Sequence, residues 1–252
     1  MRGFPTFRRL PALALLALGP TAVIQLLLGA PGPATPQVDR EAARGFDLYV
    51  AGCSTCHGVM GEGTGQGPPL MGVGPANVDF MLSTGRMPLA DPDAQPVRNP
   101  PRYSPSEIAA IVAYVVSLGP GGPEIPVVVP ESGDLARGRQ IYSANCLACH
   151  GAAAQGASVG GGAIAPSLHV SSPVQLAEAP RIGPGVMPLF DEEVISEEDM
   201  NSLVRYVLSL RTGQDRGGLG LGHVGPVIEG LVGWLIGLGL LVVVIRLTGT
   251  TT

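Results

Sequence analysis

The chain has 252 residues and is slightly acidic, with a formal net charge of −5. All 15 basic residues are arginines and 20 residues are acidic, so the chain lacks the basic balance of a nucleic-acid-binding protein. Glycine (37 residues) and proline (25 residues) make up about a quarter of the chain, a content typical of disorder unless a bound group supplies an apolar core.

Residues 1–36 combine basic and apolar residues. Three arginines among the first nine residues precede an apolar run from Leu10 to Ala30, which Gly19-Pro20 interrupts. The part before the interruption fits a signal peptide, whereas the whole run is long enough to span a membrane. We favour an uncleaved anchor, because Pro31 follows the one plausible cleavage site, and keep a signal peptide as the alternative. Either way the arginines stay inside and the next residues lie outside.

Residues 38–119 and 134–212 are predicted to be two domains that repeat one another, joined by a Pro/Gly-rich linker at 120–133. The segment that begins at Ala43 matches the one at Ala136 without a gap as far as the first cysteine of each repeat. Such self-similarity indicates one structural unit used twice.

Each repeat contains the pattern C-x-x-C-H once, which is the attachment sequence of c-type haem. Two thiols at this spacing can bond to the two vinyl groups of a porphyrin, and the next residue then lies under the iron as proximal ligand. A redox pair or half of a zinc site is the alternative, but the two copies use all four cysteines of the chain. We therefore predict two covalently bound haems c, attached through Cys53, Cys56 and His57 in the first repeat and Cys146, Cys149 and His150 in the second.

The sixth ligand of each iron is predicted to be a methionine. Met87 and Met187 lie in Gly-x-Met-Pro at matching places in the repeats, and a Met ligand closes the iron and raises its potential. The alternatives are that both only fill gaps in the core, or that His169 replaces Met187; Met60, Met71 and Met81 lack the shared context. On the proximal side, the Pro68 and Pro166 carbonyls are candidates to fix the two histidine rings.

The two domains are predicted to be all-α, because no stretch alternates like a strand. The closing helices have clear start signals, a capping box at Ser104-Pro-Ser-Glu107 and a serine cap followed by three acids at 196–199. Tyr49 with Tyr114, and Tyr142 with Tyr206, are predicted to mark the crossing of the first and last helix of each domain. Gly45 and Gly138 would permit the close approach.

Residues 213–223 read as a tether, and residues 224–247 as a transmembrane helix, since they are apolar apart from Glu229 near the start and Arg246 near the end. A fully buried soluble helix is the alternative. Arg246 would lie on the inner side of the membrane.

The two halves resemble class I cytochrome c domains in sharing Gly-x-x-x-Tyr, C-x-x-C-H, Pro-x-Leu, Met-Pro and a closing helix with Tyr. From residue 38 to 247 the chain resembles the dihaem cytochrome c subunit of the actinobacterial-type cytochrome bc1 complex, a menaquinol–cytochrome c reductase. The most specific parts are 52–58, 67–74, 83–88 and the order of tandem haem domains followed by a C-terminal span.

This resemblance implies the partners and the location. The Rieske iron–sulfur protein would reduce the subunit beside a cytochrome b subunit, and electrons would pass from haem to haem to an attached terminal cytochrome oxidase. The haem domains would lie on the outer side of the cell membrane. The chain would act as the electron-transfer subunit of the reductase, with no substrate chemistry of its own.

Two other classes of function compete. A dihaem subunit of another membrane enzyme, such as a cbb3-type oxidase or a periplasmic dehydrogenase, is the first; the cbb3 subunit carries its anchor at the N-terminus, which argues against it. A dihaem peroxidase is the second, but it needs one iron open to peroxide, and two Met-Pro loops argue against that.

Overall fold

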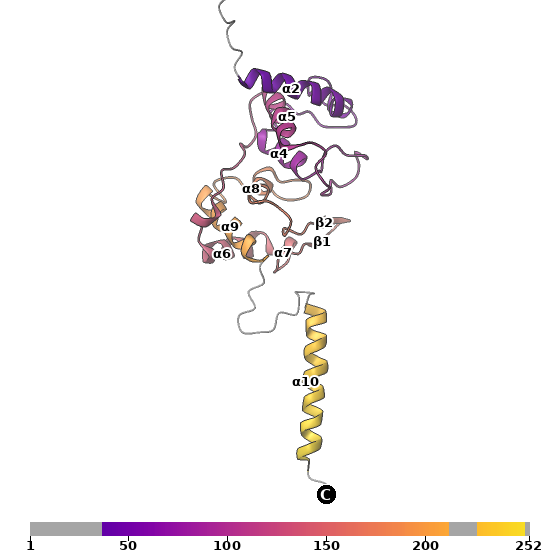
Figure 1. Cartoon of the computed structure of the whole chain (residues 1–252), viewed down its shortest axis with the longest axis vertical. Coiled ribbons are helices and arrows are strands. Elements are labelled where there is room, and N and C mark those ends of the chain that lie inside the picture. Colours follow the sequence, from indigo (N-terminus) through magenta and orange to yellow (C-terminus); the bar gives the residue numbers. More distant parts are fainter. Residues whose placement is uncertain (1–36, 212–225, 250–252) are drawn as a thin grey trace, which may run out of the picture.

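The computed structural model describes residues 37–211 and 226–249. The predicted signal or anchor segment 1–36, the tether 213–223 with His223, and residues 224–225 lie outside them. Figure 1 shows α2 and α5 at one end of the globular part and α6, α7 and α9 at the other, with α4 and α8 between them. The described part is mostly helical, as the sequence predicts.

The first half is built around the crossing of its first and last helices. Its helices are α2 (Gln37–Gly52), α3 (Ser54–His57), α4 (Pro75–Ser83) and α5 (Pro105–Ser117). Gly45 of α2 lies so close to the backbone of Ala110 that a Cβ atom there would collide with the carbonyl oxygen. One turn further on, the rings of Tyr49 and Tyr114 lie 5.0 Å apart. The predicted crossing and the role of Gly45 are confirmed.

The second half repeats this arrangement. Its elements are the 3-10 turn η1 (Pro130–Ser132), helices α6 (Leu135–Asn145), α7 (Leu147–His150), α8 (Pro173–Ile182) and α9 (Glu197–Ser209), and strands β1 (Ala157–Gly160) and β2 (Ala163–Ala165). Gly138 of α6 lies against the backbone of Ser202, and the rings of Tyr142 and Tyr206 are 5.6 Å apart. The second crossing is therefore confirmed as well.

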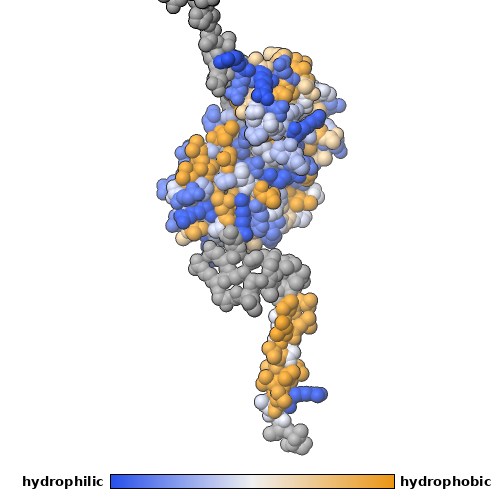
Figure 2. All heavy atoms as spheres, viewed as in Figure 1, coloured by the Kyte–Doolittle hydropathy of each residue, from blue (hydrophilic) through white to orange (hydrophobic). Residues whose placement is uncertain are grey.

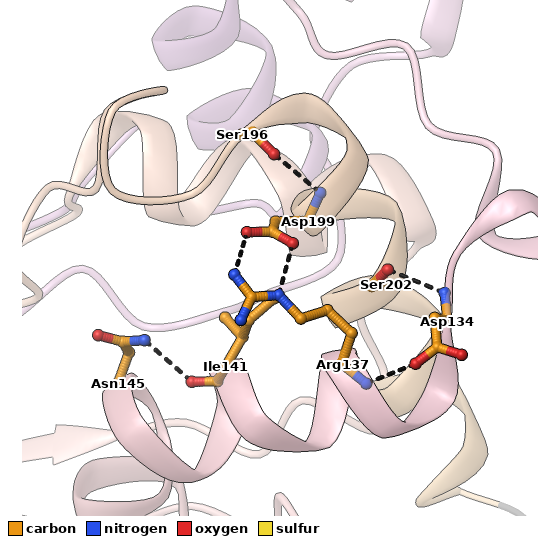
Figure 3. A network of polar contacts seen from close by, with 7 residues as sticks. All are labelled: Asp134, Arg137, Ile141, Asn145, Ser196, Asp199 and Ser202. Carbon is orange, nitrogen blue, oxygen red and sulfur yellow. Dashed lines mark hydrogen bonds and ion pairs between the residues drawn. The ribbon is translucent and has the colours of Figure 1, made fainter.

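Polar contacts fix the start of α9 against α6 (Figure 3). The Ser196 hydroxyl accepts a hydrogen bond from the Asp199 backbone N–H at 3.2 Å, which confirms the predicted cap. The Asp199 carboxylate in turn accepts two hydrogen bonds from the Arg137 guanidinium, at 2.8 and 2.6 Å. In the first half the Glu107 carboxylate instead accepts from the Ser104 backbone N–H at 2.8 Å, as the predicted capping box requires.

The short hairpin β1–β2 is a local departure from the expectation that no segment forms a strand. Its register is Ala157 with Ala165 and Ser158 with Ile164, with an irregularity before Gly160. Its residues show no polar and apolar alternation, so the periodicity on which the expectation rested could not reveal it. Glycines 160–162 form the turn with positive φ values, and Gln95 of the first half pairs with the backbone of Ile164 from outside, at 2.9 and 3.2 Å.

The two halves meet through equivalent elements, because α4 of the first packs against α8 of the second. The Gln175 side-chain amide of α8 donates to the backbone carbonyl and to the hydroxyl of Ser83, at 3.3 and 3.0 Å. Arg98 of the first half donates to Gln175 Oε1 at 2.7 Å. This interface matters for the site, because segment 95–98 reaches across it.

Helix α10 (Pro226–Thr248) is the one helix in the described residues that is long and apolar enough to cross a membrane. Its most apolar part, Gly230–Thr248, has a mean hydropathy of 2.3 and side chains that are exposed throughout. Figure 2 shows an almost continuous hydrophobic surface along it, unlike the mixed surface of the globular part. At 1.5 Å rise per residue its 23 residues match the roughly 30 Å hydrocarbon core of a bilayer.

Candidate haem-binding sites

The first C-x-x-C-H motif forms one helical turn. The His57 backbone N–H donates to the Cys53 carbonyl at 3.0 Å, which closes the turn and brings the two cysteines and the histidine onto neighbouring positions. The His57 ring nitrogen Nδ1 lies 2.8 Å from the Pro68 carbonyl oxygen. A carbonyl can only accept, so Nδ1 carries the proton and Nε2 keeps its lone pair for a metal. The prediction that Pro68 presents the carbonyl oxygen that accepts this hydrogen bond is confirmed.

The second motif has the same geometry. The His150 backbone N–H donates to the Cys146 carbonyl at 2.9 Å, and ring Nδ1 lies 3.0 Å from the Pro166 carbonyl oxygen, which confirms the second prediction of this kind. His150 is only 8% exposed, and its burial lowers the pKa of the ring. A lowered pKa favours the neutral imidazole, which is the form that binds a metal.

A tyrosine fixes the backbone after each histidine, a contact that the sequence analysis did not anticipate. The Tyr49 hydroxyl donates to the Gly58 carbonyl at 2.8 Å, and the Tyr142 hydroxyl donates to the Gly151 carbonyl at 2.6 Å. Gly58 and Gly151 both have φ near +78°, a conformation that favours glycine. Burial raises the pKa of Tyr49 to about 12 and also raises the pKa of Tyr142. The equal Tyr-to-Gly spacing in both repeats was the signal that could have revealed these contacts.

A largely apolar cavity of about 520 Å³ lies in front of the second motif. Cys146, Cys149, His150 and Met187 all line it, so the structure brings the predicted attachment residues and the predicted distal ligand to one space. Its volume falls within the range of sites for cofactors, about 300–1,000 Å³. His169 is instead held outside by a hydrogen bond between its Nε2 and the Ala153 carbonyl, at 2.6 Å.

Met87 of the first half is partly buried, and it packs with Cys53 against the core of that half. The other first-half methionines differ: Met60 and Met71 are 60% and 54% exposed, and Met81 lines the cavity beside the second C-x-x-C-H motif. Gly67 lies against His57, since a Cβ atom there would come within 3.1 Å of ring atom Cε1. The structure thus keeps Cys53 and Met87 against one core, with Gly67 beside the ring of His57.

The residues present fit covalent haem c. No disulfide joins the four cysteines, which all lie within the described residues; one is exposed and three are half-buried. Each pair shares a helical turn with a histidine whose Nδ1 already has a hydrogen-bond partner. Burial raises the pKa of the Cys53 thiol to about 11 and that of the Cys146 thiol to about 12. Within the described ranges, no group of three His, Cys, Asp or Glu side chains is arranged to hold a metal ion.

Three polar side chains of the first half also line the cavity beside the second motif: Arg86, Gln95 and Arg98. The sequence analysis did not predict them as site residues. One signal was present, because Gly-Arg-Met-Pro of the first repeat carries arginine where the second repeat has Val186. Nothing in the sequence indicated that the arginine would face the other half.

Two family models match the chain. Residues 42–119 match "Cytochrome c", and residues 133–207 match "Cytochrome C oxidase, cbb3-type, subunit III". Each family model covers one haem domain, and neither includes α10. Neither model therefore describes the whole arrangement of two domains followed by an apolar helix.

Curated relatives cover more of the chain. The cytochrome bc1 complex cytochrome c subunit of Corynebacterium diphtheriae is 36% identical over 229 residues, which is 83% of this chain and 81% of that protein. The protein of the same description from Mycobacterium leprae is 36% identical over 220 residues, 81% of this chain and 76% of that protein. The cbb3-type cytochrome c oxidase subunit FixP of Sinorhizobium medicae is 30% identical over 134 residues, 49% of this chain and 44% of that protein.

The long matches run through both haem motifs in tandem, whereas the match to the oxidase subunit covers about half of the chain. With its two cytochrome c domains and its apolar C-terminal helix, the chain belongs to the family of the cytochrome c subunits of the cytochrome bc1 complex.

Proposed function

We propose that this chain is the dihaem electron-transfer subunit of a respiratory, quinol-oxidising bc1 complex. It binds two haems c covalently, one through Cys53, Cys56 and His57 and the other through Cys146, Cys149 and His150. Met87 and Met187 are the distal ligands. The observation that carries the proposal is the duplicated geometry, in which each motif histidine points Nδ1 at a proline carbonyl and keeps Nε2 free.

Bound haem c supplies one-electron transfer, and the protein supplies the environment for it. The two proline carbonyls hold the histidine rings in one tautomer and one orientation, which keeps their Nε2 atoms directed at the metal position. The thioethers of Met87 and Met187 would hold the iron on the side opposite the histidines, and a haem held in this way would be closed to small oxidants. The tyrosine hydroxyls on Gly58 and Gly151 fix the loop that follows each histidine, and so limit the movement of the ligands when the charge changes.

The place of the chain in the respiratory complex is inferred from its family. It receives electrons from the Rieske iron–sulfur protein beside the cytochrome b subunit, and passes them through its two haems to a terminal cytochrome oxidase. Helix α10 anchors it in the cell membrane, with the haem domains on the outer side and Arg246 on the inner side. The membrane-bound complex, not this chain alone, carries out quinol oxidation.

A subunit of a cbb3-type oxidase remains the second candidate, because the model for residues 133–207 has that description. The two candidates differ in what the chain assembles with. Purification through a tag on this chain should recover a cytochrome b and a Rieske protein if the proposal holds. Recovery of a haem–copper oxidase catalytic subunit without either of them would favour the second candidate.

Haem content tests the cofactor directly. A pyridine haemochrome assay on the purified chain should give two haems c, and a haem-stained denaturing gel should show that they are covalent. Replacing Cys53 and Cys56 by serine should leave one haem, and so should replacing Cys146 and Cys149. A wild-type content of one haem, or zinc in place of iron, would contradict the proposal.

A further inference from the structure

Arg86 is a buried cation of the first half without an anionic partner. Its side chain is 7% exposed, and its Nη1 has no hydrogen-bond partner among the described residues. The guanidinium carbon lies 4.8 Å above the ring of Phe80, which holds the group in place but does not neutralise its charge. An unpaired buried charge costs free energy, so we expect an anion to bind beside Arg86.

Arg98 is a second cation on the same wall. It is half-buried and is tied across the interface by hydrogen bonds from Nη2 to the Ser171 hydroxyl at 3.2 Å and to Gln175 Oε1 at 2.7 Å, both neutral partners. The ion pair found in the described residues is Arg137 with Asp199, on the outside of α6 and α9, so no carboxylate of the described chain neutralises these two arginines.

Both arginines line the cavity that also holds Cys146, Cys149 and His150. A haem attached through its vinyl groups keeps two free propionates, and a carboxylate is the anion whose geometry a guanidinium matches. Resting on the proposed function, we propose that Arg86, supported by Arg98, binds a propionate of the haem that the second half attaches. The first half thereby contributes a binding group to the cofactor of the other half.

Comparison of the two repeats shows that the first half supplies this cation to the second site, whereas the second half supplies none to the first site at the matching position. Val186 stands where Arg86 stands in the first repeat, and it is 71% exposed. The second half therefore offers no equivalent cation to the first haem at this position. Arg86 is therefore a feature of the interface between the two halves, and it is not one of the residues that the two repeats share.

A positive group beside a haem disfavours the oxidised, more positive state and raises the potential of that haem. In the full-length chain, purified in detergent with both haems, R86Q should lower the midpoint potential of the second haem. We expect about a tenfold change in its ratio of reduced to oxidised form, which equals 59 mV for a one-electron couple. The change in R98Q should be smaller and in the same direction, and R86K should recover part of the loss.

Two further measurements sharpen the test. R139Q removes one exposed arginine of α6 that does not line the cavity, and it should leave both potentials within a twofold change of that ratio. In R86Q the unpaired propionate should take up a proton more readily, so the potential of the second haem should fall as pH rises across its ionisation. The second haem is identified by repeating the titration in an M187H background, which shifts that haem alone.

The outcomes separate this inference from the proposed function. If R86Q retains two haems and leaves the second potential unchanged, or shifts only the first, the inference is wrong while the proposed function stands. If the wild-type chain lacks covalent haem, the proposed function fails first. If R86Q does not assemble, R86K and R98Q supply the same comparison, and unchanged potentials in both would overturn the inference.

Discussion

The two halves carry the same motif, the same crossing of helices and the same bond from histidine to a proline carbonyl, yet they enclose their sites differently. His57 is half-buried, and the described contacts of its site come from its own half. His150 is 8% exposed and faces a cavity whose wall includes Phe80, Arg86 and Arg98 of the other half. The difference teaches that the motif positions the residues proposed as ligands, whereas the neighbouring half supplies part of the wall of the second site.

The largest expected consequence is a difference in potential between the haems. Burial and nearby positive charge both disfavour the oxidised haem, so the second haem should have the higher potential, and an electron should move downhill from the first to the second.

M87A and M187A should each lower the potential of their own haem by roughly 0.1–0.2 V, a fraction of the 0.8 V range that axial ligands span. Each should also admit carbon monoxide at that haem.

Spectroelectrochemical titration of the wild type and of these two variants checks this expectation. Replacement of exposed Met60 by alanine is the matched control and should change neither potential. Equal potentials of the two haems in the wild type would contradict the expected difference between the halves. Carbon monoxide binding by the wild type would mean that one iron is open, and would revive the peroxidase alternative.

A second effect concerns the interface. Glu178 of α8 is fully buried, and both of its carboxyl oxygens lack a hydrogen-bond partner among the described residues. Burial, and then the nearby charge of Asp79 on α4, raise the pKa of Glu178 from 4.5 to about 9. Between these pH values the folded chain holds a proton that the unfolded chain has lost, so the free energy of unfolding decreases as pH rises.

E178Q should remove this dependence, because glutamine stays neutral. At pH 7 the variant should be more stable than the wild type by on the order of 2–3 kcal/mol, since one pKa unit corresponds to about 1.4 kcal/mol. Denaturant unfolding of the full-length chain in detergent from pH 5 to 9 measures it, and E131Q, which changes an exposed glutamate, is the control. Parallel pH curves for E178Q and the wild type would show that Glu178 does not hold its proton.

The smallest effect is expected for salt. Six acids between residues 191 and 199 form an acidic surface on the second half, which could attract a basic diffusing carrier. The structure already uses two of them, because Asp191 accepts from the backbone N–H groups of Glu193 and Val194 and Asp199 pairs with Arg137. If the electron acceptor is a permanent neighbour, steering is not needed.

Electron flow from quinol to oxygen in intact membranes should therefore change less than about twofold between low and moderate salt, over which the Debye length falls from about 30 Å to about 8 Å. Oxygen consumption measures it. A steep decrease that added soluble cytochrome c restores would show that the second haem passes its electron to a mobile carrier.

Much of each half could be predicted because its determinants are close in sequence. The C-x-x-C-H turn spans one helical turn, the caps at Ser104 and Ser196 act on the next three residues, and the length of α10 follows from its composition. The crossings at Gly45 and Gly138 and the carbonyls of Pro68 and Pro166 join more distant residues. They could still be predicted because the same spacing occurs in both repeats.

What the sequence by itself determined is therefore the content of each half: two haem motifs with their histidines, helices that cross at a glycine, and an apolar C-terminal helix. Only the tertiary structure decided how the halves face one another. It placed Arg86 and Arg98 on the cavity beside the second motif, Gln95 on the hairpin strand and Glu178 near Asp79. Hydrogen bonds between the halves, such as Gln95 to Ile164 and Gln175 to Ser83, join residues 69 and 92 positions apart. No local periodicity records such pairings, because they depend on which surfaces the two folded halves bury against each other.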